Sequence, residues 1–595
     1  MEGIERKGAI PWGDNPDYKV FRHVVNDYGA DPTGQRDSTA AIQRAINDGK
    51  RCGAACNGAT TKNAIVYFPP GTYLVSSSIS IYFGTQIIGD AINLPTIRAA
   101  SSFVGLGVLS TQIRNLKIDI TASNPGAYVA ALHYQVAQVM TIENVEIIAD
   151  SAMTQQGMYA ENGSGGVMSD ITFTGGNFGI YRGSQQFSAA RLTFNGCNTA
   201  VKVIWDWGWV WKSITVKNTK VGFRLYNDAN GQISGSVTII NSVFSSTESF
   251  TIEMAVPVNV MDSGFTGLVL DNVTIFADST NKPSLLGPSI AGLDVAPYFE
   301  HPRNQYTNKT AVDFIHLKDE GAASDGSIDN TDAVQNAFNK YGNGSKIILV
   351  DTSTYIIKRT ITVPKNAKII SETWSQFAAS GGYFSNASKP AVMLRVGNKG
   401  EVSNIELQDL ILTSKGPTPG VILMEWNVAA ESAGSAALWD VHIRLGGATG
   451  TKLTLTECPP ITTGTNPSSC QLWVADHMID DPLLNDPLNN MEQLSMYSAQ
   501  GMLIESQKAT WLYRTASEHS VFYQYNFNGA QNIFTTFLQT ESPYYQPTPK
   551  PPAPFDQVVG TFDSDPTYGS DGSDADGCDA SCAVIMKNLR MLKAL

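Results

Sequence analysis

A short strand-like tripeptide recurs through the first half of the sequence at a nearly constant interval. Its four copies begin at Ile171, Leu192, Ile214 and Val237, so the intervals between them are 21, 22 and 23 residues. Each copy contains a β-branched residue and is followed by glycine or asparagine turn signals. An antiparallel sandwich usually shows turn signals every ~8–12 residues. The longer interval predicts a solenoid instead, namely a right-handed parallel β-helix whose coils stack ~4.8 Å apart.

A longer repeat divides the sequence into halves. Residues 25–49 and 317–341 share an acidic residue before a glycine, a polar turn and a short amphipathic helix, and they start 292 residues apart. We therefore expect an all-β protein of two tandem β-helix domains, residues 1–300 and 301–595. The short helix that opens each domain is expected to cap the solenoid and to cover strand edges that would otherwise pair with other chains.

The charge of the chain limits its partners. The 595 residues carry a formal net charge of −13, which argues against nucleic acid or an anionic membrane surface as a partner. The sequence has no apolar run of about 18 residues, so it predicts no transmembrane helix. We expect a monomer that binds neither nucleic acid nor membrane.

The cysteines indicate an oxidising compartment. Six of the seven form pairs that are close in sequence, and Cys197 is left alone. The pairs, which predict loop-stapling disulfides, are Cys52/Cys56, Cys458/Cys470 and Cys578/Cys582. Five N-glycosylation sequons begin at Asn162, Asn272, Asn308, Asn343 and Asn386. The first residues lack the basic and apolar regions of a signal peptide, so we expect an extracellular protein whose signal is missing from this chain.

Two glutamates near the end of the chain are spaced by one expected coil. Glu518 and Glu541 each follow a small hydroxyl residue at the end of an apolar, β-rich run, and they lie 23 residues apart. A shift by this interval aligns Ser517 with Thr540, and Trp511 with Phe534. We therefore expect the two carboxylates on one face of neighbouring coils. Glycosidic bond hydrolysis uses such a pair, one carboxyl as a protonated acid and the other to handle water. The alternative is that either glutamate is a solvated residue at a strand end.

Several longer strings resemble a known family. The strings DYGADPTGQRDSTAAIQRAI and YFPPGTYL look like the opening of a pectate-lyase-like β-helix shared by many polysaccharide-active enzymes. Five more resemble glycoside hydrolase family 55, the fungal exo-β-1,3-glucanases: GGNFGIYRGSQQF (175–187), WDWGWVWKS (205–213), LWVADH (472–477), TASEHSVFYQYNF (515–527) and QTESPYYQPTPKPPAPF (539–555). The resemblance covers nearly the whole chain.

The resemblance implies an activity and a division of roles. It implies an inverting, exo-acting hydrolase that releases sugars from the non-reducing end of laminarin-like β-1,3-glucan, with no cofactor and no metal. Glu541 would be the acid, and Glu518 would position and activate the attacking water. Gln185 (or Gln186) and Ser213 would hold that water from the first domain. The cleft would then lie at the interface of the two domains.

The resemblance also implies a set of sugar-binding residues: Trp473, Asp476, Tyr544 and Trp209. Trp209 is one of four tryptophans that alternate along an expected strand, from Trp205 to Trp211, which would place all four on one face. Such a face could stack on sugar or pack between the domains. His519 is expected to be a structural hydrogen-bond partner rather than a catalyst.

Other readings of the sequence remain open. The chain could be a β-helix pectin lyase or polygalacturonase, although it contains no GHG string of the polygalacturonase type. It could also be a non-catalytic β-helix that binds glycans. The family's sequences begin upstream of Met1 and continue past Cys582, so the resemblance implies truncation at both ends.

Overall fold

The computed structural model describes residues 2–12, 17–51, 60–108, 112–135, 140–163, 165–225, 236–254, 267–276, 299–323, 325–454, 456–458, 471–474, 495–568 and 580–594. The chain divides into two compact units. We call the unit formed by Phe21–Arg51 and Ala64–Phe299 the N-terminal unit. The C-terminal unit consists of Met1–Val20, Cys52–Asn63 and Glu300–Ala594.

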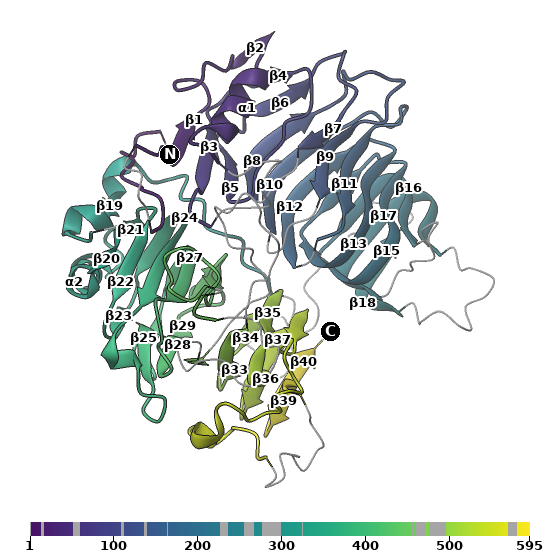
Figure 1. Ribbon diagram of the computed structural model, residues 1–595. Helices are drawn as coiled ribbons and strands as arrows, with labels where there is room; N and C mark the ends of the chain where they lie inside the picture. The colour runs from purple at the N-terminus through teal and green to yellow at the C-terminus, as the bar shows by residue number, and fades with distance from the viewer. Residues whose placement is uncertain are drawn as a thin grey trace. The chain divides into compact units, whose positions relative to one another are not determined.

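The N-terminal unit is built from three ladders of parallel strands (Figure 1). The first ladder contains β1 (Phe21–His23), β3 (Ala64–Phe68), β5 (Thr85–Gly89), β8 (Gln112–Asp119), β10 (Met140–Ile148), β12 (Gly166–Thr174), β13 (Phe178–Ala190), β15 (Thr199–Lys212), β17 (Ser236–Met254) and β18 (Gly267–Phe276). The second adds β2 (Thr33–Asp37), β4 (Thr72–Val75), β6 (Thr96–Ala99), β14 (Thr193–Asn195) and β16 (Thr215–Leu225). The third adds β7 (Leu106–Val108), β9 (Ala130–Gln135) and β11 (Gln156–Glu161). A parallel β-helix is therefore the architecture of this unit.

Long strands take part in two ladders because they bend at a left-handed corner. Asn115, Asn144 and Asp170 occupy equivalent positions in β8, β10 and β12, with φ of 60°, 53° and 56°. Asparagine and aspartate tolerate this conformation better than other side-chain-bearing residues. The Asn144 amide also donates a hydrogen bond of 2.8 Å to the Asn115 side-chain oxygen, which ties one coil to the next.

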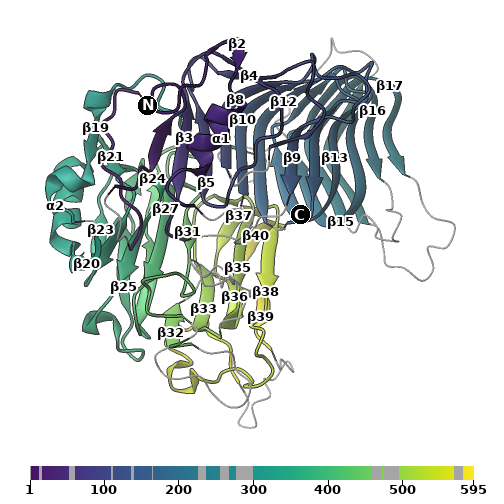
Figure 2. The ribbon, with the colours of Figure 1, turned by 45° about the horizontal axis from the view of Figure 1, so that its top comes forward.

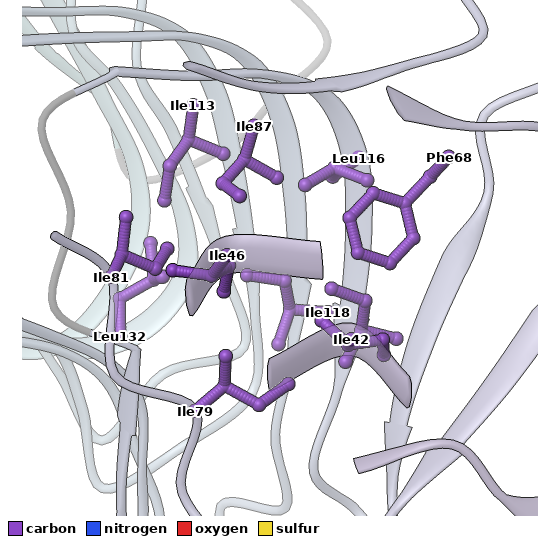
Figure 3. A pocket seen from close by; sticks show the side chains of 11 residues that line it. Ile42, Ile46, Phe68, Ile79, Ile81, Ile87, Ile113, Leu116, Ile118 and Leu132 are labelled. Carbon is purple, nitrogen blue, oxygen red and sulfur yellow. The ribbon is translucent and has the colours of Figure 1, made fainter. Parts of the chain in front are cut away.

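The interior of the N-terminal unit is a stack of apolar side chains. One column of paired positions runs through Ile113, Ile142, Met168, Ala189, Trp211 and Ile239, all buried. At the end of this core lies helix α1 (Thr39–Asn47), and its Ile42 and Ile46 face the strands (Figure 3). The cavity between them is about 10 Å³ and has an apolar lining, near the lower limit for one water molecule. It is a packing defect and not a ligand site.

The C-terminal unit repeats this plan with shorter ladders. Its first strands are β19 (Phe314–His316), β20 (Asp325–Asp329), β21 (Ile347–Val350), β22 (Thr354–Ile357), β23 (Ile361–Val363) and β24 (Lys368–Ala379), with helix α2 (Thr331–Tyr341). The middle strands are β25 (Ala391–Val396), β26 (Val402–Ser403), β27 (Glu406–Ser414), β28 (Val421–Trp426), β29 (Ala429–Ala430), β30 (Ala437–Trp439) and β31 (His442–Ile443). The last are β32 (Gln471–Val474), β33 (Tyr497–Ile504), β34 (Thr510–Leu512), β35 (Thr515–Glu518), β36 (Ser520–Asn528), β37 (Gln531–Thr535), β38 (Leu538–Glu541), β39 (Cys582–Lys587) and β40 (Arg590–Ala594).

The two copies of the long repeat have the same element order. Each runs strand, strand, helix, strand, strand: β1–β2–α1–β3–β4 in one copy and β19–β20–α2–β21–β22 in the other. The Tyr73 hydroxyl donates to the Pro69 carbonyl, and the Tyr355 hydroxyl donates to the Asp351 carbonyl, both at 2.8 Å. The repeat is therefore visible in hydrogen bonds as well as in sequence. The division at residue 300, the handedness of the coils and the capping role of the helices stay predictions.

One part of the predicted coil spacing is wrong. Thr172 pairs with Thr193 and Thr193 with Thr215, as the intervals of 21 and 22 residues require. Thr215, however, pairs with Val243, and Val237 pairs with Trp209. The observed interval here is 28 residues instead of 23, so the tripeptide at Val237 stands five residues out of the predicted register. Residues 237–240 and 242–244 both contain apolar and β-branched residues, so composition alone could not tell which of the two segments stacks on residues 214–216.

The cysteine predictions are resolved in part. Cys458 is disulfide-bonded, while its predicted partner Cys470 lies outside the described residues. Cys197 is a buried free thiol, as its isolation in sequence predicted. Cys52, Cys56 and Cys578 lie outside the described residues. Among the helices that the structure describes, none is long and apolar enough to cross a membrane.

Candidate active site

The two glutamates face each other across adjacent coils of the C-terminal unit. Strands β35 and β38 pair in parallel, with Glu518 opposite Glu541 and Ser517 opposite Thr540 (Figure 2). In the preceding ladder Trp511 stands opposite Phe534. The predicted offset of one coil is therefore confirmed. Each glutamate is the last residue of its strand, where the backbone leaves the ladder and the side chain can reach a surface.

The environments of the two carboxylates differ. Glu518 is 4 % exposed, and the Gln539 side-chain amide donates a hydrogen bond to its Oε1. A donated hydrogen bond stabilises the charged form of a carboxylate and fixes its orientation. The Glu541 side chain is 46 % exposed, so solvent and substrate can reach it. The pair thus combines one buried, oriented carboxylate with one accessible carboxyl group.

His519 joins the two coils. It has a φ of 63° at the bend between β35 and β36, and its main-chain N–H donates to the Glu541 carbonyl at 2.7 Å. Its ring is 2 % exposed, with Nε2 3.4 Å from Glu541 Oε2. The Tyr544 ring packs against it with centroids 4.7 Å apart. The structural role expected for His519 agrees with the main-chain bond, but its ring also lies directly beside the exposed carboxyl.

Strand β33 packs closely against Ser517 of β35 and Gln524 of β36. Gly501 in β33 passes so near that an added Cβ would come within 2.2 Å of the Gln524 carbonyl oxygen and 2.3 Å of Ser517 Oγ. Gln524 holds the start of β36, because its side chain accepts from the Ser520 N–H at 3.0 Å and donates to the Ser520 carbonyl at 2.9 Å. Glycine at this position therefore lets β33 support the strand that ends in Glu518.

Sequence reasoning did not single out Gln539 or Gly501. The signal for Gln539 was present, because the shift of 23 residues puts it opposite Ala516, whose small side chain leaves room for the amide. No local signal identifies Gly501, since its constraint comes from atoms of Ser517 and Gln524 farther along the chain.

One donor atom from each of Glu518, His519 and Glu541 lies within 4.8 Å of the other two.

Comparison with known proteins identifies the family. The family model "Rhamnogalacturonase A/epimerase, pectate lyase-like" matches residues 21–224. The chain is 34% identical to a "Probable glucan endo-1,3-beta-glucosidase" of Arthroderma benhamiae, over 96% of this chain and 84% of that protein. It is 32% identical to a "Glucan 1,3-beta-glucosidase" of Cochliobolus carbonum, over 97% of this chain and 82% of that protein. The chain belongs to their family, glycoside hydrolase family 55.

Other relatives differ in length and name. The chain is 37% identical to the "Non-secreted LysM effector LysM15" of Penicillium expansum, over 98% of this chain but only 46% of that protein. It therefore spans less than half the length of this relative. A solved structure of sacteLam55A from Streptomyces sp. SirexAA-E is similar to it with a TM-score of 0.41 and 13% identity, over 91% of this chain and 82% of that one.

The expected water-binding residues of this family 55 chain lie in the N-terminal unit. Gln185 is half-buried in β13, and its carbonyl accepts from Trp209 Nε1 at 3.0 Å. Ser213 follows β15 in a left-handed conformation with a φ of 56°, and Asn241 Nδ2 donates to its Oγ at 3.3 Å. Ser213 thus occupies a corner between two ladders. The Glu518–Glu541 pair belongs to the C-terminal unit, and a shared water stays a prediction.

Trp209 does not suit the expected role in sugar binding. It is 1 % exposed, and its ring packs between Phe187 and Trp211, with centroids 5.1 and 4.9 Å away. The Arg182 guanidinium lies 3.9 Å from its ring centroid. A ring covered in this way has no face for a sugar. The single tryptophan face is also wrong, because Trp207 is 64 % exposed: β15 takes part in two ladders and bends between them.

The remaining sugar-binding candidates are only partly described. Tyr544 is 43 % exposed beside His519, so one face of its ring can meet a ligand. The main chain of Trp473 lies in β32, and its side chain lies outside the described part of the structure. Asp476 is likewise outside the described residues.

Proposed function

We propose that this chain is an exo-acting β-1,3-glucan hydrolase that releases sugar from the non-reducing end with inversion of the anomeric centre. The observation that carries the proposal is the direct pairing of Glu518 with Glu541 on adjacent coils, one buried and one accessible. The names of its family 55 relatives support the substrate class. Relatives are named both for endo action and without it, so exo action rests on the resemblance of the site strings.

The difference in environment supports the assignment of roles. Glu541 is accessible enough to reach a glycosidic oxygen, as a general acid must. Glu518 is held by Gln539 in a form suited to an anion, as a group that activates water must be. We assign Gln185 and Ser213 to the attacking water, and Tyr544, Trp473 and Asp476 to the terminal sugar.

The distance between the carboxylates bears on the stereochemistry. One oxygen of the Glu518 carboxylate lies within 4.8 Å of one oxygen of the Glu541 carboxylate. Retaining glycosidases hold the carboxyl groups about 5–5.5 Å apart, and inverting ones about 6.5–9.5 Å. Inversion needs more room between the carboxyl groups than this closest approach, and the exposed Glu541 side chain can move outward to provide it. A pair that stays close would instead suit retention with Glu518 as the nucleophile, which is the second candidate.

The roles are tested with Glu541→Gln on laminarin. This variant keeps the shape of the side chain but cannot deliver a proton, so sugar release should fall by roughly 10²–10⁴-fold while laminarin binding persists. The control is Glu505→Gln, which alters a carboxylate bonded to Asn528 at 2.7 Å, away from the pair. Equal release by wild type and Glu541→Gln would refute the acid assignment.

Product analysis separates the finer alternatives. The anomer first released, measured by proton NMR, should be α if the enzyme inverts, whereas a β product would establish retention. Early products from laminarin should be a single small sugar, whereas a ladder of oligosaccharides would establish endo action. Cleavage of polygalacturonate in place of laminarin would favour the pectinase alternative, and binding without cleavage would favour a glycan-binding protein.

We also infer an extracellular location. The disulfide of Cys458 suits an oxidising compartment. The asparagines of four sequons, Asn162, Asn308, Asn343 and Asn386, are exposed. Two relatives are named non-secreted effectors.

A further inference from the structure

We propose that Glu518, His519 and Glu541 form an inhibitory binding site for a divalent transition-metal ion such as Zn²⁺. The first observation is geometric: one donor atom from each residue lies within 4.8 Å of the other two. An imidazole and two carboxylates are a donor set that suits Zn²⁺ and its neighbours. A small inward movement of Glu541, whose side chain is half exposed, would bring the donors to coordination distance.

The second observation is independent of the carboxylates. His519 is 2 % exposed, and neither ring nitrogen makes a hydrogen bond to any residue that the structure describes. Its Nε2 lies 3.4 Å from Glu541 Oε2. Buried imidazole nitrogens normally have a hydrogen-bond partner. A metal ion is a partner that a neutral imidazole binds through such a nitrogen.

Two of the three ligands are already oriented. The Gln539 amide donates to Glu518 Oε1, and the Tyr544 ring packs on the His519 ring. Groups that orient metal ligands in this way raise affinity, and their loss typically costs about 10–100-fold. The exposed Glu541 provides the entry path. The donor set is unsuited to Ca²⁺, which takes six to eight oxygen ligands.

The consequence for catalysis rests on the proposed function. A cation bound to Glu541 would hold it as an anion, so it could not donate a proton to a leaving group. The ion would also occupy the space between the carboxylates. Zn²⁺ should therefore inhibit laminarin hydrolysis, and excess chelator should restore it.

Binding is measured by isothermal titration of the full chain with ZnCl₂, in parallel with CaCl₂. We expect one Zn²⁺ per chain and no saturable heat with CaCl₂. His519→Asn should weaken Zn²⁺ binding by about ten-fold or more. Asparagine is the replacement best suited to the positive φ of this position. The matched control is His442→Asn, which removes a histidine paired with Asp440 at 2.7 Å elsewhere in the same unit and should leave binding unchanged.

The outcomes are distinct from those for the hydrolase. Glu541→Gln, which removes one charged ligand, should also weaken Zn²⁺ binding. If circular dichroism shows that His519→Asn does not fold, the Glu541→Gln variant still tests the site. An absence of saturable Zn²⁺ binding, or equal affinity in wild type, His519→Asn and Glu541→Gln, would overturn the proposal. A chain that binds Zn²⁺ as expected but releases no sugar would refute the hydrolase and leave the metal site standing.

Discussion

Gln539 shows how a single residue can orient another residue of the candidate site. Its amide donates to Glu518 Oε1, and its main chain pairs with Ala516 one coil away. The residue does not need to touch the substrate to matter, because it keeps a buried carboxylate in one orientation. Glu541 has the opposite character, since nearly half of its side chain is exposed and a ligand can reach it.

Gln539→Ala should lower kcat on laminarin by roughly ten-fold, because a hydrogen bond to a charged group is worth about 1.5–3 kcal/mol. KM should change less, since the amide orients the partner of the acid and not the sugar. The control is Gln531→Ala, which removes an exposed amide bonded to the Gln507 side chain at 2.7 Å in the neighbouring ladder. Equal kinetics for the two variants would show that the Gln539 bond has no part in turnover.

Among the strands, β35, which ends in Glu518, depends on close packing against β33. Strand β33 pairs with β36, and its Gly501 leaves space for Ser517 and Gln524. In the N-terminal unit the left-handed corners at Asn115, Asn144 and Asp170 let one strand pair in two ladders. Gly501 and the corner residues therefore determine how closely neighbouring strands pack and where a strand bends.

Gly501→Ala should destabilise the protein by roughly 1–3 kcal/mol, because its Cβ would overlap backbone and side-chain atoms of the next coil. Displacement of Ser517 should also reduce activity through the adjacent Glu518. Urea denaturation measures the loss against Gly382→Ala, whose Cβ would meet nothing within 4 Å. A midpoint unchanged from wild type would mean that β33 can move aside without cost.

At the scale of the whole molecule, each unit has its own hydrophobic interior. One cluster of buried residues runs from Val24 to Phe244 and another from Leu317 to Val558. The exposed sequon asparagines occur in both units, which suits a protein that passes through the secretory pathway.

Expression of the chain behind a secretion signal should yield a glycoprotein. We expect glycan at some or all of Asn162, Asn308, Asn343 and Asn386, because these side chains are exposed. Intact mass before and after enzymatic deglycosylation measures occupancy, and a variant with glutamine at all four positions is the control. A secreted chain without glycan would contradict this expectation.

Part of the fold and of the site could be predicted from the sequence. The coil interval, the order of elements in the long repeat and the facing of Glu518 and Glu541 all follow from local alternation and turn spacing. The stacking of the tripeptide at Val237 could not be predicted, since a second segment with apolar and β-branched residues, five residues further along, occupies the expected position. The role of Trp209 was wrong for a related reason: a bend within β15 sends neighbouring tryptophans to different surroundings.

A stacked parallel β architecture and the one-coil separation of Glu518 and Glu541 could thus be inferred from the order of the residues alone. Both depend on the spacing of strand and turn residues along the sequence, which can be counted without a structure. The three-dimensional structure was needed to show that Glu518 is buried and Glu541 exposed, and that Trp209 belongs to the core. It also showed that the buried His519 ring makes no hydrogen bond to any described residue. Burial depends on which atoms the neighbouring coils bring to a position, and those atoms are distant in sequence.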